Sequence, residues 1–121
     1  MKVLIIDDEP LVRRSLGRAL KSKDHDIVEA VDGPQGLAAW RAEKPDLVFL
    51  DVLMPGMNGP QVLSLILEEA GKANIGKVIL ISAFSGEHNM ETALQMGADL
   101  FIPKPFDNIF DVVSMAEDLM R

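Results

Sequence analysis

The chain has 121 residues, enough for one domain that buries roughly two-thirds of the surface its unfolded form would expose. A net charge of −7 argues against nucleic-acid binding, which needs a clustered basic face, and the lack of cysteine excludes disulfides and thiolate metal sites. No apolar stretch approaches the ~20 residues that span a bilayer, and no signal-peptide pattern is present, so we expect one cytoplasmic domain over residues 1–121 that contacts no membrane.

Strand-like runs alternate with helical patterns along the whole chain. The short apolar runs predict strands over residues 2–6, 26–31, 46–50, 77–82 and 99–103. Apolar residues at helical spacing predict helices over residues 9–22, 34–43, 60–70, 87–96 and 107–120. In the first helix we expect Leu11 to face inward and Arg13 outward. The alternation predicts a doubly wound α/β fold, in which a parallel sheet of five strands carries five helices on both faces. If this sheet has the flavodoxin-like order 2-1-3-4-5, its first and third strands are neighbours.

Charged residues stand at the ends of three of these strands. Asp7 and Asp8 follow the first strand, Asp51 follows the third, and Lys104 follows the fifth between two prolines. Ligands of open parallel sheets bind beyond the carboxyl ends of the strands, so these four side chains are expected to meet at one edge. A single aspartate there would be explained as a helix cap, but two adjacent acids followed by Glu9 exceed that need.

This combination of charges predicts a divalent cation beside a phosphoryl group. Carboxylates about 4 Å apart repel by ~4 kcal/mol per pair at an effective dielectric near 20, so either one stays protonated or a cation binds. Mg²⁺ suits the site better than Ca²⁺, because it accepts one or two carboxylates and takes phosphate oxygens as further ligands. The ammonium of Lys104 is a candidate hydrogen-bond donor to the phosphoryl group, and we expect the bond from Lys104 to Pro105 to be cis. The hydroxyl of Ser82, at the end of the fourth strand, is a candidate partner for a phosphoryl oxygen.

Four segments together resemble the receiver domain of two-component response regulators, in the superfamily of the chemotaxis regulators. They are Ile6 to Pro10, Asp51 to Gly59, Ser82-Ala83 and Lys104 to Phe106. Each segment alone is a weak indication, but all four occur in the order and at the spacing of that family. The resemblance covers essentially the whole chain.

The resemblance implies a phosphorylation-activated signalling switch and not an enzyme in its own right. Asp51 would be the phosphoacceptor, taking a phosphoryl group from the phosphohistidine of a sensor kinase, from a phosphotransfer protein or from a small phosphodonor. Mg²⁺, or Mn²⁺ in its place, would be held directly by Asp8, Asp51 and the backbone carbonyl of Leu53. Asp7 would act on the metal through a bound water.

The resemblance also implies how the switch works. Lys104 would stabilise the phosphoryl oxygens, and Ser82 would turn toward the new phosphoryl group. Phe101 occupies the aromatic switch position and would fill the space that Ser82 vacates. A tyrosine is common at that position; because Phe101 lacks the hydroxyl, its inward, buried state should be favoured.

The readout surface of this family is the face made by the fourth helix, fifth strand and fifth helix. Its change would control a partner or an output domain, or would form a homodimer. The apolar residues available on or near this face are Met90, Met96, Phe101, Phe106 and Met115. Near the acidic site, Leu53 and Phe84 are apolar where polar groups occur in other members, which predicts slow self-dephosphorylation.

Three other functions compete with this interpretation. A phosphatase of the haloacid dehalogenase type would carry a second aspartate at position 53, where this chain has Leu53. A flavodoxin would need a Ser/Thr/Gly-rich phosphate loop after the first strand, where Asp7, Asp8 and Glu9 would repel phosphate. A degenerate receiver that serves only as a scaffold would lack part of the acidic site, and no acidic residue is missing here.

Overall fold

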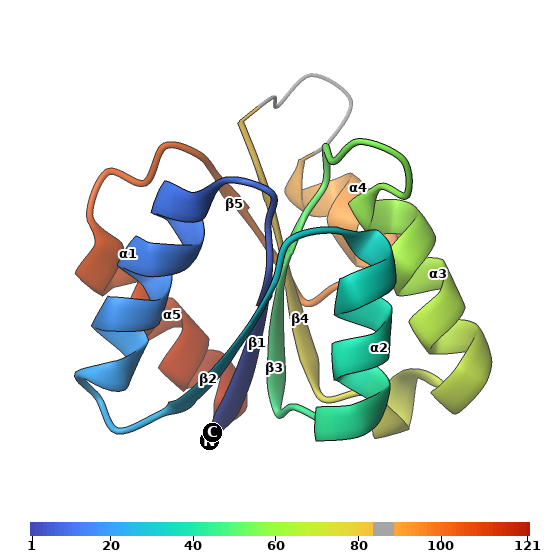
Figure 1. The fold of residues 1–121 in the computed structure, drawn as a ribbon, viewed down its shortest axis with the longest axis horizontal. Coiled ribbons are helices and arrows are strands. Elements are labelled where there is room, and N and C mark those ends of the chain that lie inside the picture. The colour runs from blue at the N-terminus through green and yellow to red at the C-terminus, as the bar shows by residue number, and fades with distance from the viewer. Residues whose placement is uncertain (84–88) are drawn as a thin grey trace.

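The computed structural model describes residues 1–83 and 89–121. Five parallel strands form one sheet in the order β2-β1-β3-β4-β5, which confirms the predicted flavodoxin-like topology (Figure 1). The strands are β1 (Lys2–Ile6), β2 (Asp26–Ala30), β3 (Leu47–Asp51), β4 (Lys77–Ser82) and β5 (Leu100–Pro103). All five residues of β3 are buried, as expected for the central strand of a sheet covered on both faces.

Helices cover both faces of the sheet (Figure 1). One face carries α1 (Pro10–Lys21) and α5 (Ile109–Met120), and the other carries α2 (Gly33–Glu43), α3 (Gly59–Ala70) and α4 (Met90–Gln95). Alternate strand residues supply the two cores: Leu4 and Val48 belong to the cluster under α2 and α3, whereas Val3 and Leu47 belong to the cluster under α1 and α5. None of the helices in the described ranges combines the length and apolar character needed to cross a membrane.

The observed boundaries differ from the predicted ones in a few places. A 3-10 turn, η1 (Lys72–Asn74), was not predicted because three residues carry no periodicity. Helix α4 is shorter than residues 87–96, since Asn89 accepts a hydrogen bond from the Thr92 amide as the N-cap. Residues 87 and 88 lie outside the described residues. The expectation for α1 was wrong at two positions: Leu11 is 75% exposed, and the Arg13 side chain is only 14% exposed.

The end of the sheet away from Asp51 carries a cavity of about 430 Å³ between α2, α3 and η1. Trp40, the only tryptophan in the chain, is near the last turn of α2 and lines this cavity with Pro45 and Ile75. The cavity lies at the start of β3, which begins at Leu47, whereas Asp51 closes the same strand.

Candidate functional site

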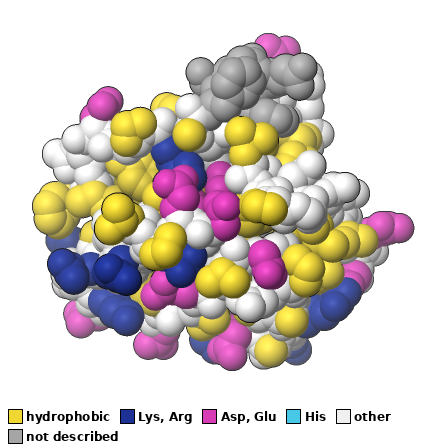
Figure 2. Space-filling model, turned by 45° about the horizontal axis from the view of Figure 1, so that its top comes forward, with side chains coloured by type: hydrophobic (Ala, Val, Ile, Leu, Met, Phe, Trp, Pro, Cys, Tyr) yellow, Lys and Arg dark blue, Asp and Glu magenta, His cyan; other side chains and the backbone are white. Residues whose placement is uncertain are grey.

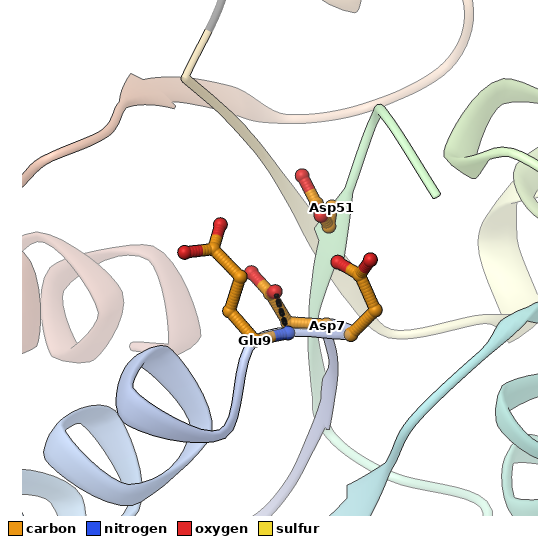
Figure 3. A group of neighbouring side chains, drawn as sticks. Asp7, Glu9 and Asp51 are labelled. Atoms are coloured by element: carbon orange, nitrogen blue, oxygen red, sulfur yellow. Dashed lines mark hydrogen bonds between the residues drawn. The ribbon is translucent and has the colours of Figure 1, made fainter. Parts of the chain in front are cut away.

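The acidic site forms where β1 and β3 end side by side. Ile6 pairs with Leu50 in the parallel register, so Asp7 and Asp51 are the next residues of two neighbouring strands. Asp7 is fully buried and Asp51 is 2% exposed, while Asp8 and Glu9 are exposed at the beginning of α1. If one carboxylate oxygen is taken from each of these four residues, the four oxygens all lie within 4.8 Å of one another. Figure 3 shows Asp7, Glu9 and Asp51 converging on one space.

Lys104 is carried into this space by the end of β5. Its backbone N–H donates to the Ser82 carbonyl at 2.8 Å, and its bond to Pro105 is cis, the isomer expected from the sequence. The Nζ atom lies 3.0 Å from Asp7 Oδ2, 2.7 Å from Glu9 Oε1 and 3.4 Å from Asp51 Oδ1. One ammonium therefore faces three carboxylates, and a basic side chain borders the acidic group on this face of the molecule (Figure 2).

Burial and mutual repulsion change the acidity of these groups. Burial, followed by the charge of Asp7, raises the pKa of Asp51 to about 7, and Lys104 offsets only part of this effect. Burial also raises the pKa of Asp7, against the hydrogen bonds from the Glu9 amide and from Lys104. Burial opposes the charge of Lys104, but its contacts with Glu9, Asp7 and Asp51 outweigh that cost and raise the pKa of the ammonium above its usual value. The single ammonium of Lys104 therefore does not balance the negative charge of the carboxylates around it.

Two residues that the sequence analysis did not assign to the site hold Asp7 in place. The Glu9 N–H donates to Asp7 Oδ1 at 2.8 Å (Figure 3), and Arg13 Nη1 donates to the Asp7 carbonyl at 2.7 Å. Glu9 is also the N-cap residue of α1, yet its side chain makes no capping hydrogen bond, so its carboxylate is available to Lys104. The indication for Glu9 in the sequence was the third consecutive acid after β1. No feature of the sequence indicated Arg13, because the helical spacing predicted that its side chain would face solvent.

The loop from β3 to α3 holds Asp51 against the neighbouring strand. Val52 N–H donates to the Ile81 carbonyl at 2.9 Å, and Gly59 N–H donates to the Val52 carbonyl at 3.0 Å. A Cβ atom at Gly59 would overlap the Asp51 carbonyl, so only glycine lets α3 begin this close to the end of β3. Leu53, in the same loop, has a side chain that is 53% exposed.

The remaining predicted site residues lie on β4 and β5. Ser82 is fully buried at the end of β4 and pairs with Pro103, the residue before Lys104. Phe101 is 9% exposed and belongs to the core cluster under α2 and α3. Of the apolar residues expected on the readout face, Met90 and Met115 are exposed, whereas Met96 and Phe106 are half-buried against the core clusters. Phe84 lies outside the described residues.

The donor set suits a hard divalent cation. It consists of carboxylate oxygens alone, gathered within 4.8 Å around a raised-pKa aspartate. Mg²⁺ prefers oxygen ligands and requires few of them from the protein. The carboxylates of Asp7, Asp8, Glu9 and Asp51 are the oxygen donors available to such an ion.

Comparison with known proteins identifies the family. The model of the response regulator receiver domain matches residues 3–114, and the chain therefore belongs to this family of two-component signalling domains. The chemotaxis protein CheY of Treponema pallidum is 38% identical over 109 residues, which cover 88% of this chain and 74% of that protein. The probable transcriptional regulatory protein TcrX of Mycobacterium tuberculosis is 36% identical over 120 residues, covering 98% of this chain and 49% of that protein. The chain thus spans about half the length of some relatives and most of another.

Solved structures agree with the family and the fold. The response regulator TrrA of Thermotoga maritima, determined in complex with Mg²⁺ and BeF, is 29% identical with a TM-score of 0.83, over 98% of this chain and 97% of that one. The receiver domain of NtrX from Brucella abortus is also 29% identical, with a TM-score of 0.86 over 98% and 97% of the two chains. The resemblance stated from the sequence is confirmed.

Proposed function

We propose that residues 1–121 form one receiver domain that accepts a phosphoryl group on Asp51 and changes its α4-β5-α5 face in response. The observation that carries this proposal is the position of Asp51. Its carboxylate is buried at the carboxyl edge of the sheet among three other acids, with Lys104 Nζ 3.4 Å away. A buried carboxylate beside a cation site and an ammonium is suited to nucleophilic attack on phosphorus.

The transfer needs little chemistry beyond positioning. An Asp51 Oδ atom forms a bond to phosphorus as the bond from phosphorus to the donor nitrogen of a phosphohistidine breaks, and that imidazole nitrogen takes up a proton. Asp51 must be ionised to attack, so its pKa of about 7 makes the reaction sensitive to pH and to bound cations. Lys104 neutralises part of the charge on the phosphoryl oxygens, and the Ser82 hydroxyl turns toward one of them.

Mg²⁺ would be held by Asp8, Asp51 and the Leu53 carbonyl, with Asp7 acting through water, and Mn²⁺ could replace it. When bound, the ion supplies the charge neutralisation that lets a phosphate dianion approach several carboxylates. The expectation that these residues share one ion is supported by the 4.8 Å grouping of the carboxylates of Asp7, Asp8 and Asp51.

Signalling would pass to the α4-β5-α5 face. Inward movement of Ser82 would leave room for Phe101, which is already buried, and the equilibrium of this face would shift. The donor would be a histidine sensor kinase or a phosphotransfer protein, and the receiver of the signal a partner, an output domain or a second copy of the chain. Gel filtration with and without beryllofluoride tests for the homodimer. A cytoplasmic location without nucleic-acid or membrane contact remains a prediction of the sequence.

The phosphorylated state should be long-lived. The Leu53 side chain is exposed two residues after Asp51, and an apolar group there cannot orient an attacking water. Leu53→Asn should therefore shorten the lifetime of the phosphorylated protein several-fold, measured by intact mass after the phosphodonor is removed. An unchanged lifetime would exclude this explanation.

The central test is incubation with acetyl phosphate and Mg²⁺, followed by intact-mass measurement. Wild type should gain one phosphoryl group, and Asp51→Asn should gain none. Asp24→Asn is the matched control, because Asp24 is an exposed aspartate after α1 with a φ of 64°, a conformation that asparagine tolerates. It should be phosphorylated like wild type. An adduct that persists in Asp51→Asn would refute the assignment.

A further inference from the structure

Lys104 is held most closely by a residue outside the set assigned to phosphoryl transfer. Its Nζ atom is 2.7 Å from Glu9 Oε1 and 3.0 Å from Asp7 Oδ2, but 3.4 Å from Asp51 Oδ1. The two shorter distances are charge-assisted hydrogen bonds, whereas the third is at most a weak one. The ammonium is thus drawn toward the start of α1 and away from the carboxylate that would be phosphorylated.

The Glu9 side chain has no structural role that explains this contact. It is 56% exposed, and it does not cap the helix that it begins. The Asp7 carboxylate, by contrast, is fully buried and receives the Glu9 amide, so breaking its contact with Lys104 would leave a buried oxygen without that partner. Of the two close partners of Lys104, only Glu9 can be released into solvent at little cost.

We propose that Glu9 is a positioning residue that restrains Lys104 in the unphosphorylated state and competes with the phosphoryl group for its ammonium. This inference rests on the proposed function of Asp51. A phosphoryl group adds further oxygen acceptors and nearly two negative charges, so it attracts the same N–H donors that Glu9 now occupies. The contact with Glu9 holds the ammonium away from Asp51, so phosphorylation weakens this contact and the site binds the phosphoryl group less tightly than it would without Glu9.

Two substitutions separate contact from charge. Glu9→Ala removes both the contact and the charge, whereas Glu9→Asp keeps the charge but is one methylene too short for the present hydrogen bond. The measurement is the calorimetric affinity for beryllofluoride at saturating Mg²⁺, together with the rate of phosphorylation by acetyl phosphate. Asp107→Ala is the matched control, since Asp107 is an exposed acid three residues after Lys104.

Both Glu9 variants should bind beryllofluoride roughly two- to fivefold more tightly than wild type, the range set by a partly exposed ion pair. Asp107→Ala should bind like wild type. Tighter binding by Glu9→Ala alone would show that only charge matters and would overturn the inference, as would unchanged or weaker binding by both variants. Binding of beryllofluoride by wild type but not by Asp51→Asn would show that the phosphoryl site works. Either contradicting result for the Glu9 variants would then exclude only the proposed role of Glu9. If wild type itself gains neither beryllofluoride nor a phosphoryl group, the proposed function fails with it.

Discussion

Asp51 should make the stability of the metal-free protein depend on pH. Its folded-state pKa is raised from 3.8 to about 7, so the folded state binds a proton that the unfolded chain releases at lower pH. This contribution to stability is complete below the unfolded pKa and is lost as the pH rises through about 7. We expect the free energy of unfolding of wild type, relative to Asp51→Asn, to fall by about 2–3 kcal/mol between about pH 5 and about pH 8.

Urea unfolding in the presence of a chelator measures this difference. Comparison with Asp51→Asn cancels the titration of groups elsewhere in the molecule. Saturating Mg²⁺ should reduce the pH dependence, because the ion binds the folded protein with its carboxylates ionised. If the free energy of unfolding of wild type, relative to Asp51→Asn, rises with pH or stays constant, the raised pKa of Asp51 is contradicted.

Lys104 should be necessary for folding stability as well as for phosphoryl transfer. Its side chain is 5% exposed and contacts the buried Asp7. Lys104→Met leaves that carboxylate unpaired, and we expect a loss of roughly 3–5 kcal/mol near pH 8 without metal. The loss should be smaller near pH 6, where Asp51 is protonated and the repulsion is weaker.

The matched control for this variant is Lys2→Met. Lys2 pairs with Glu43 at 3.0 Å, but both side chains are more than one-third exposed. Breaking such a pair should cost about 0–1 kcal/mol. Similar losses in the two variants, measured by urea unfolding at the same pH, would show that burial of the Lys104 pair does not matter.

Residue-level contacts were the part of the site that the sequence predicted least well. Asp7, Asp8, Asp51 and Lys104 were expected together because the ends of parallel strands must meet. The contact of Glu9 with Lys104 and that of Arg13 with the Asp7 carbonyl depend on rotamers of long side chains. Spacing in the sequence does not determine such rotamers, so these two contacts could not be predicted from it.

At the scale of elements, the start of α3 controls where Asp51 lies. We expect Gly59→Ala to lower the free energy of unfolding by about 1–3 kcal/mol or more, because the new Cβ would overlap backbone atoms of Asp51 and Val52 that cannot move independently of β3. The phosphorylation rate should fall with it, since the loop that carries the site must shift. Urea unfolding and the intact-mass assay measure the two effects.

Gly17→Ala is the control for that change. Gly17 lies within α1, and a Cβ there would sit 3.6 Å from Ile27 and 3.8 Å from Glu29, which are ordinary contacts. Alanine in a helix interior is favoured over glycine by about 0.5–1 kcal/mol, so this variant should be as stable as wild type or more so. A Gly59→Ala protein that is equally stable would show that α3 can begin farther from β3 than it does here.

The strands were easier to predict than the short helical elements. An uninterrupted apolar run such as Val3 to Ile6 must be buried on both faces, and this requirement favours a central strand. Helix α4 has only six residues, and its start depends on the Asn89 cap more than on a long apolar stripe. Within α1, Leu11 is exposed because it shares one stripe of the helix with Ser15 and Arg18, which are exposed as well.

At the scale of the whole molecule, the order of strands determines the site. Strict alternation of strands and helices predicts a parallel sheet covered on both faces. The order 2-1-3-4-5, expected for a flavodoxin-like sheet, then makes β1 and β3 neighbours. The identity of the partner, unlike the position of the site, does not follow from the order of the strands. It depends on the shape and charge of a second molecule, about which neither the fold nor the acidic site carries information.

The position of Trp40 determines what intrinsic fluorescence can report. The single indole is carried by α2 and lines the cavity at the start of β3 together with Pro45 and Ile75. The length of β3 separates this cavity from Asp51. Its emission should therefore follow unfolding while remaining silent to magnesium or acetyl phosphate. An optical readout of phosphorylation will need a second fluorophore, and exposed Leu53, beside the acidic site, is the natural place to introduce a tryptophan.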